Sequence, residues 1–189
     1  MMTKVDSTNQ LRMMVYDSLF AALTAVGAFL SIPVGPVPIV LQNMFVYLAG
    51  LLLRSRWGLA SVGVYLLVGA VGLPVFAGGL GGIGRFVGPT GGYLIGYLPT
   101  VFLVGKIAHR NTPRMITDVL AMICGTLVLY ACGVTWLKIV SGMPLDKTLA
   151  LGMYPFLIGD AIKIAAAAAI ARALRPVIRV SGSASRVAG

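Results

Sequence analysis

The sequence predicts an all-α integral membrane protein, with six transmembrane helices and a glycine-rich outer loop that caps a ligand pocket. The first observation is composition: 58% of the 189 residues are hydrophobic and only 11% are charged, whereas a soluble domain carries roughly 25% charged residues. The second is a series of apolar stretches near the length of about 20 residues that a helix needs to span a bilayer. The third is a strong asymmetry in the positions of Lys and Arg.

The apolar stretches predict the helices of one transmembrane domain that covers residues 1–189. They lie at about 13–32, 39–53, 57–74, 90–108, 115–138 and 149–173. Proline, glycine and charged residues interrupt the hydrophobic pattern between them, as in "RSR" at 54–56 and "SGMPLDK" at 141–147. The second stretch is short, and no soluble domain fits into the remaining residues.

Positive charge predicts that both termini lie in the cytoplasm. If the N-terminus is inside, the inside segments hold eleven cations and the outside loops hold three. The eleven are Lys4, Arg12, Arg54, Arg56, Lys106, Arg110, Arg114, Arg172, Arg175, Arg179 and Arg186, and the three are Arg85, Lys138 and Lys147. Such an excess marks the cytoplasmic side of membrane proteins. The cations lie beside apolar spans, so the formal charge of +10 does not indicate nucleic-acid binding.

Of the five acidic residues, only Asp160 lies well inside a predicted helix, and Lys163 follows it at position i+3. This spacing places both side chains on one helix face. A charge near the centre of a bilayer costs at least a few kcal/mol and normally faces a bundle interior or a cavity. We favour a polar ligand site over the alternative, an ion pair that only holds the sixth helix against its neighbours.

The stretch "GGLGGIGRFVGPTGGYLIGY" at 78–97 contains nine glycines and one cation, Arg85. Glycine permits tight turns and close approach of the backbone to a ligand, and irregular backbone at membrane depth is tolerated where it lines a cavity. We therefore predict a re-entrant or capping loop over a site between helices, with Arg85 available for a carboxylate. A flexible linker is the alternative, although Phe86, Thr90 and Tyr93 are not linker residues.

Small residues in the first predicted helix indicate a close contact between helices. Ala21 and Ala25 are four residues apart, and Ser18 and Ala22 form a second such pair. Small side chains at this spacing let membrane helices approach closely. The residues alone leave two interpretations open: packing within the chain, and docking to another membrane subunit.

Residue types that catalysis or metal binding needs are scarce. The sequence has one histidine, His109, in a basic loop, no glutamate, and two cysteines, Cys124 and Cys132, within one apolar stretch. It also lacks a Walker motif, so any ATP hydrolysis must come from partner subunits. We therefore predict neither an enzyme nor a bound metal or cofactor.

Several segments together resemble the BioY family, the substrate-binding S-components of energy-coupling factor (ECF) biotin transporters. The most specific are "VPIVLQ" at 37–42 and "GPTGGYL" at 88–94. The resemblance extends from "LTAVGAFL" at 23–30 to "GDAIKIAAAA" at 159–168. Val40 departs from it, since the resemblance leads us to expect a threonine there.

The resemblance implies a multi-pass protein of a bacterial or archaeal cytoplasmic (inner) membrane that binds biotin tightly. Its implied partners are biotin, membrane lipid, a transmembrane coupling subunit and two ATP-binding-cassette ATPase subunits, with no nucleic acid. The resemblance also implies that Ala21 and Ala25 dock the coupling subunit. A stand-alone carrier that moves biotin without ATPase subunits is the alternative function.

The biotin site implied by the resemblance combines the polar residues of both singled-out stretches. Arg85 is our first choice for the biotin carboxylate. Asp160 would accept from a ureido N–H, and Lys163 would donate to the ureido oxygen or pair with the carboxylate. The remaining expected contacts are Gln42, Thr90, Tyr93, Phe86, Gly91 and Gly92.

Overall fold

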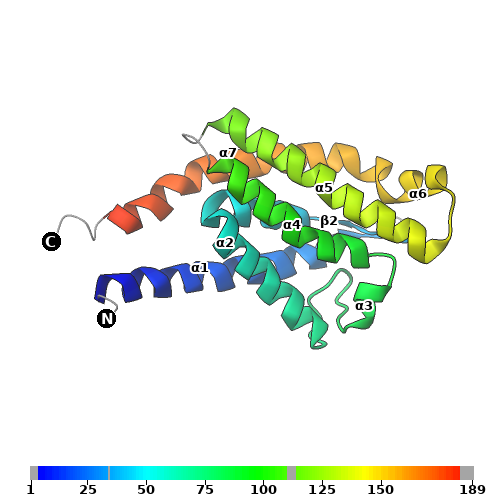
Figure 1. Ribbon diagram of the computed structural model, residues 1–189, viewed down its shortest axis with the longest axis horizontal. Coiled ribbons are helices and arrows are strands. Elements are labelled where there is room, and N and C mark those ends of the chain that lie inside the picture. The colour runs from blue at the N-terminus through cyan, green and yellow to red at the C-terminus, as the bar shows by residue number, and fades with distance from the viewer. Residues whose placement is uncertain (1–3, 34, 110–113, 184–189) are drawn as a thin grey trace.

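A computed structural model of the chain describes residues 4–33, 35–109 and 114–183, which are mostly helical. The helices are α1 (Lys4–Phe29), α2 (Gln42–Ala70), α3 (Gly84–Val87), α4 (Gly91–Ala108), α5 (Met115–Ser141), α6 (Leu145–Gly152) and α7 (Leu157–Ser183), with a 3₁₀ turn, η1 (Tyr154–Phe156), before α7. Figure 1 shows the long helices packed side by side along one axis, with the short helices α3 and α6 toward one end.

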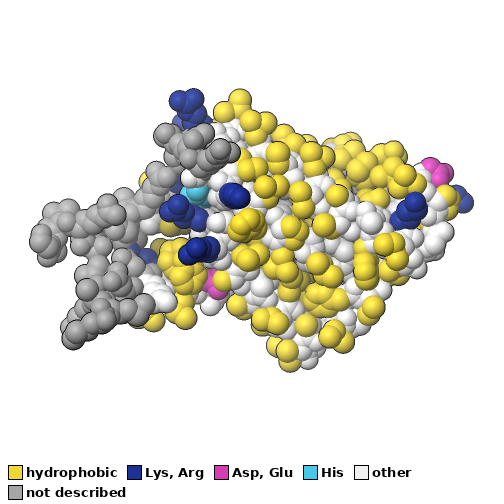
Figure 2. All heavy atoms as spheres, viewed as in Figure 1, with side chains coloured by type: hydrophobic (Ala, Val, Ile, Leu, Met, Phe, Trp, Pro, Cys, Tyr) yellow, Lys and Arg dark blue, Asp and Glu magenta, His cyan; other side chains and the backbone are white. Residues whose placement is uncertain are grey.

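Four helices are long and apolar enough to cross a membrane: Gln10–Phe29 of α1, α2, α4 and α5. Figure 2 shows hydrophobic side chains over the middle of one face, and Lys and Arg side chains gathered mainly at the end where α1 begins and α7 ends. This distribution agrees with the predicted helical membrane protein. The helix α7 is not one of the four, and it carries Asp160, Lys163, Arg172 and Arg175.

Helix α2 consists of two antiparallel halves, a first half (42–53) and a second half (55–70), joined at Arg54. The backbone at Arg54 has φ 68° and ψ 178°, which is not helical. Gln42 Nε2 donates to Tyr65 Oη over 2.8 Å, although the two residues are 23 positions apart and would be separated by about 35 Å along a straight helix. The break that the sequence predicts here is therefore present, and a single residue makes it.

Glycine residues allow the two halves of α2 to pack closely against α4. A Cβ atom on Gly105 of α4 would lie 2.5 Å from the Ser55 nitrogen. A Cβ atom on Gly58 would lie 2.9 Å from Val101 Cγ2 of α4 and 3.2 Å from the Ala49 oxygen of the first half. Any larger side chain at Gly105 would push α4 away from the turn at Arg54, since the nearest atoms belong to backbone.

Two of the predicted helices have different bounds in the structure. Between α1 and α2, the strands β1 (Ser31–Ile32) and β2 (Ile39–Val40) pair antiparallel, so the helix predicted at 39–53 begins only at Gln42. The helix predicted at 149–173 is instead divided into α6, η1 and α7. Pro155 lies at this division, where it has no N–H to donate to a continuous helix.

Five of the eleven cations predicted on the cytoplasmic side are exposed in the structure. They are Arg54, Arg56, Lys106, Arg114 and Arg172. Arg110 and Arg186 lie outside the described residues, and Lys4 and Arg179 are described only as positions of α1 and α7.

Candidate functional site

A cavity of about 360 Å³ lies between the helices and the two irregular segments that precede and follow α2. Helices α2, α4, α5 and α7 all contribute to its wall. Its polar lining includes Gln42, Asn43, Arg85, Tyr130, Asp160 and Lys163. A space of this size, with apolar walls and a few polar groups, is typical of small-molecule sites.

Asp160 of α7 is the centre of the polar network and is only 4% exposed. Lys163 Nζ and Asn43 Nδ2 donate to its Oδ1 at 3.0 and 2.7 Å. Tyr130 Oη donates to its Oδ2 at 2.5 Å. An ionised carboxylate offers about four acceptor positions, so these three donors compensate most of its burial and leave about one position unused.

Within the described part of the chain, Asn43 of α2 uses only the nitrogen of its side-chain amide for a hydrogen bond. Its Nδ2 faces Asp160, which is the orientation an ionised carboxylate requires because it only accepts hydrogen bonds. Its Oδ1 is buried and has no hydrogen-bond partner among the described residues. Since Lys163 Nζ carries three protons and one is directed at Asp160, the network presents both an acceptor and spare donors.

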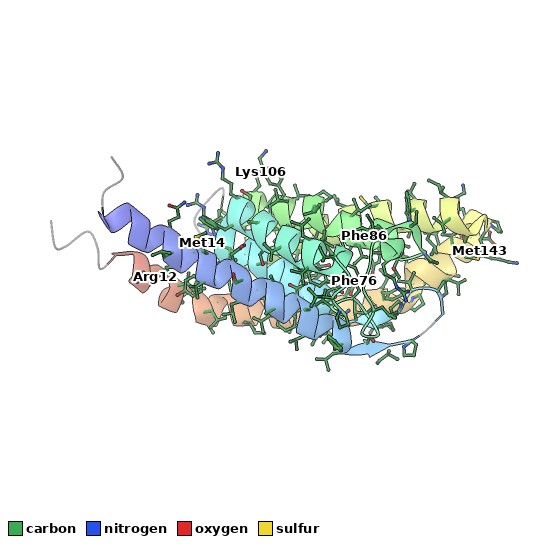
Figure 3. The ribbon with its side chains drawn as sticks, turned by 90° about the horizontal axis from the view of Figure 1, so that it is seen from below. Arg12, Met14, Phe76, Phe86, Lys106 and Met143 are labelled. Atoms are coloured by element: carbon green, nitrogen blue, oxygen red, sulfur yellow. The ribbon has the colours of Figure 1, made fainter. Side chains whose placement is uncertain are left out.

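The segment between α2 and α4, which includes residues 78–90 of the glycine-rich stretch, forms part of the cavity wall through Phe76, Leu80, Arg85 and Thr90 among others. The buried ring of Phe76 packs edge-on against Tyr65, with centroids 5.5 Å apart, and against Phe86 at 5.7 Å. Figure 3 shows Phe76 and Phe86 close together. These aromatic contacts attach the segment to α2.

Six of the predicted site residues line this one cavity. They are Gln42, Arg85, Thr90, Tyr93, Asp160 and Lys163. Two of the six are also held from outside it, since Gln42 donates to Tyr65 Oη and Tyr93 Oη donates to the Gly152 oxygen over 2.6 Å.

The other three, Phe86, Gly91 and Gly92, are not among the described residues that line the cavity. The two glycines lie at the start of α4 against Trp136 of α5. A Cβ atom on Gly92 would lie 2.2 Å from Trp136 Cβ, and Trp136 Nε1 donates to the Gly88 oxygen over 3.0 Å. Their position therefore indicates packing that holds α4 and the glycine-rich segment in place.

A comparison with known protein families finds a match over nearly the whole chain. A family model described as the BioY family matches residues 1–180. The chain belongs to the BioY family. This is a family of membrane transporters and not an enzyme class, and it confirms the resemblance expected from the sequence.

Curated relatives and a solved structure agree. The "Probable biotin transporter BioY" of Pyrococcus horikoshii is 43% identical over 158 residues, covering 84% of this chain and 93% of that protein. The "Biotin transporter BioY" of Thermotoga maritima is 39% identical, covering 87% and 96%. A crystal structure described as the "S-component for biotin from an ECF-type ABC transporter" is 34% identical with a TM-score of 0.85, covering 93% of this chain and 95% of that chain. This BioY-family chain therefore has the S-component fold.

Asn43 and Tyr130 were not predicted from the sequence. Asn43 follows Gln42 directly in an otherwise apolar segment, and a polar residue at membrane depth is a signal that could have found it. Tyr130 lies within "TLVLYACG", where nothing distinguishes it from a core aromatic residue. Only the packing of α5 against α7 reveals its hydrogen bond to Asp160.

The small residues of α1 face different ways. Ala21 is 7% exposed and belongs to the hydrophobic core, and Ala25 is half-buried. Ser18 and Ala22 are exposed. They lie in an outward stripe that also carries exposed apolar residues such as Val15.

Proposed function

We propose that this protein is the high-affinity biotin-binding S-component of an ECF-type vitamin uptake transporter, energised by a separate coupling subunit and two ATPase subunits. The observation that carries the proposal is the cavity itself. It combines a hydrogen-bonded Asp160–Lys163 pair with Arg85 around one small space, in a chain related to proteins named biotin transporters.

The chemistry of biotin fits this lining. A cyclic urea has a carbonyl oxygen that accepts and N–H groups that donate, so Lys163 is suited to the oxygen and the remaining acceptor position of Asp160 to an N–H. Arg85 is suited to the terminal carboxylate, since a guanidinium binds carboxylates through two parallel hydrogen bonds. Val40, Phe76 and other apolar lining residues would surround the ring sulfur and the aliphatic tail.

We propose a topology of six membrane segments within one transmembrane domain, 1–189, with both termini cytoplasmic. The two halves of α2 count separately because the chain reverses at Arg54, and α7 is the sixth because its charges at Asp160 and Lys163 are buried and paired. The excess of cations on one side supports the orientation. In this arrangement the glycine-rich segment lies on the outer side and caps the site.

The coupling subunit is proposed to dock on α1, near Ala21 and Ala25. Because Ala21 is buried, the exposed small residue next to it, Ala22, is the better test position. We expect Ala22→Trp to abolish uptake with the coupling and ATPase subunits while leaving biotin binding intact, because a bulky ring keeps a partner helix at a distance. Normal uptake by this variant would contradict the docking role.

Equilibrium binding of labelled biotin to the purified protein in detergent, without ATP, tests the function. We expect saturable binding that unlabelled biotin displaces. Lipoate, which has a carboxylate tail and sulfur but no urea, should not displace it at the same concentration. Binding no higher than background would overturn the proposal, whereas biotin uptake in cells without coupling subunits would favour a stand-alone carrier.

A further inference from the structure

Arg54 has a positive φ angle, which glycine adopts far more easily than arginine. Every other described residue with positive φ is a glycine, and the chain has 24 glycines. The combination of φ 68° and ψ 178° is adopted almost only by glycine, because a Cβ atom is strained there. Residues held in such a conformation cost free energy and are concentrated at functional sites.

Nothing in the described part of the chain explains why the side chain is an arginine. Arg54 is exposed. The ion pairs among the described residues are Lys163–Asp160 and Arg175–Asp118, and Arg54 takes part in neither. Its guanidinium group is therefore available to an anion from outside the chain.

Two more exposed cations lie beside this turn. Arg56 is two residues further along the chain. Lys106 directly follows Gly105 of α4. Because Gly105 has no side chain, α4 contacts the backbone of Arg54 and Ser55 at this point, which brings Lys106 close to the turn. Lys106 Nζ lies 5.8 Å from the centre of the Phe102 ring, and Figure 3 shows Lys106 on the outer side of the bundle.

An apolar surface begins directly next to these cations. Phe102 on α4 is 41% exposed and Leu59 on the second half of α2 is 37% exposed. The two helices are pressed together here, at Gly58 and Val101. In a membrane protein, cations and aromatic rings at the border of an apolar surface lie at the level of the lipid headgroups.

We propose that Arg54, Arg56 and Lys106 bind the phosphate of an anionic phospholipid whose acyl chains lie along Leu59 and Phe102. Guanidinium groups bind phosphate through paired charge-assisted hydrogen bonds. Clusters of cations beside membrane helices attract anionic headgroups. A lipid fits better than an acidic protein surface because the cations and the apolar flank are contiguous, as are the headgroup and tails of a lipid.

Thermal unfolding of the full chain in neutral detergent tests this site, with phosphatidylglycerol or phosphatidylcholine added in steps. We expect phosphatidylglycerol alone to raise the melting temperature in a saturable way. Arg56→Gln with Lys106→Gln should weaken its apparent affinity by about 25-fold, at about fivefold for each cation. The matched double variant Lys138→Gln with Lys147→Gln, which removes two exposed cations elsewhere, should leave the affinity unchanged.

Arg54 itself provides the sharper test, because strain and binding can be separated. Arg54→Gly and Arg54→Gln both remove the charge, so both should weaken phosphatidylglycerol binding about fivefold. Only the glycine variant relieves the backbone, so it should melt at a higher temperature than the glutamine variant.

Three results would overturn the proposal. One is unchanged phosphatidylglycerol affinity in Arg56→Gln with Lys106→Gln, and loss of coupling-subunit binding in that same variant would assign the cations to an acidic protein surface. The second is a phosphatidylglycerol affinity that stays unchanged in both Arg54 variants. The third is an equal stabilisation by soluble glycerol phosphate at the same concentration, which would indicate a free-anion site. Biotin binding should be the same in all these variants.

Discussion

Two buried aspartates, Asp118 and Asp160, are each paired with a cation of α7, but the two pairs are built differently. Asp118 of α5 is 1% exposed. It accepts hydrogen bonds from both terminal nitrogens of one residue, Arg175, over 2.6 and 2.7 Å. Asp160 receives single hydrogen bonds from three residues on three helices. Asp160 lines the cavity, and Asp118 is not among the described residues that do.

The two pairs differ in how many hydrogen-bonding groups they leave free to bind another molecule. The two-pronged contact of Arg175 with Asp118 uses matched groups on both sides, which fixes α5 against α7 and offers little to a third molecule. Around Asp160, each donor is only partly used: Lys163 keeps further protons and Asn43 keeps its oxygen. We therefore interpret the first pair as a structural clamp and the second as a binding network, and the two can be separated by mutation.

The largest expected effect is on folding, from Asp118→Ala. This change leaves Arg175 without its partner in a largely buried position, and breaking a buried pair typically costs about 3–5 kcal/mol. We expect a clear fall in melting temperature, with unchanged biotin affinity in the protein that remains folded. The double variant Asp118→Asn with Arg175→Met should recover most of the loss. A drop in biotin affinity that persists in that recovered double variant would contradict a purely structural clamp.

The matching double variant at the other pair, Asp160→Asn with Lys163→Met, should show the reverse. It strands no charge, so the protein should fold and elute normally. Biotin affinity should fall by about 2–4 kcal/mol, because two charge-assisted hydrogen bonds of roughly 1.5–3 kcal/mol each are lost with imperfect additivity. That corresponds to roughly 30- to 1,000-fold in Kd. Parent-like affinity in a well-folded double variant would mean that this pair, too, only holds the bundle together.

A smaller effect is expected from Tyr130→Phe, which removes one of the three donors to Asp160. A hydrogen bond to an ionised carboxylate contributes roughly 1.5–3 kcal/mol. Because this one orients Asp160, we expect only about 1 kcal/mol of it to appear in the biotin affinity, a weakening of about fivefold. Competition with labelled biotin measures this, and desthiobiotin, which keeps the urea, should lose the same factor. Equal affinities of the parent and the variant would show that Tyr130 does not organise the network.

The sequence predicts those features that depend on neighbours along the chain. Hydrophobic pattern and charge locate most helices and the reversal near Arg54, and helical spacing places Asp160 and Lys163 on one face. The break before α7 was also within reach, since Pro155 lies inside the predicted helix at 149–173 and proline interrupts helices. The apolar pattern continues on both sides of the proline and hides this break.

Contacts between distant segments could not be predicted in this way. Asn43 and Asp160 are 117 positions apart, and only the packing of α2 beside α7 brings them together. Gly92 looks like a ligand-approach glycine in the sequence, but it lies against Trp136. A glycine allows close approach of any neighbour, and its position in the sequence does not tell which neighbour it is.

The shortness of the first half of α2 determines how deep the bound molecule lies. Twelve helical residues, 42–53, rise by only about 18 Å, and the hydrocarbon layer is about 30 Å thick. If the turn at Arg54 lies at one surface, then Gln42, which lines the cavity, is about 12 Å below the other. A molecule that binds at this depth has already passed through more than a third of the hydrocarbon layer. The movement that completes its crossing then has less than two thirds of that thickness left to cover.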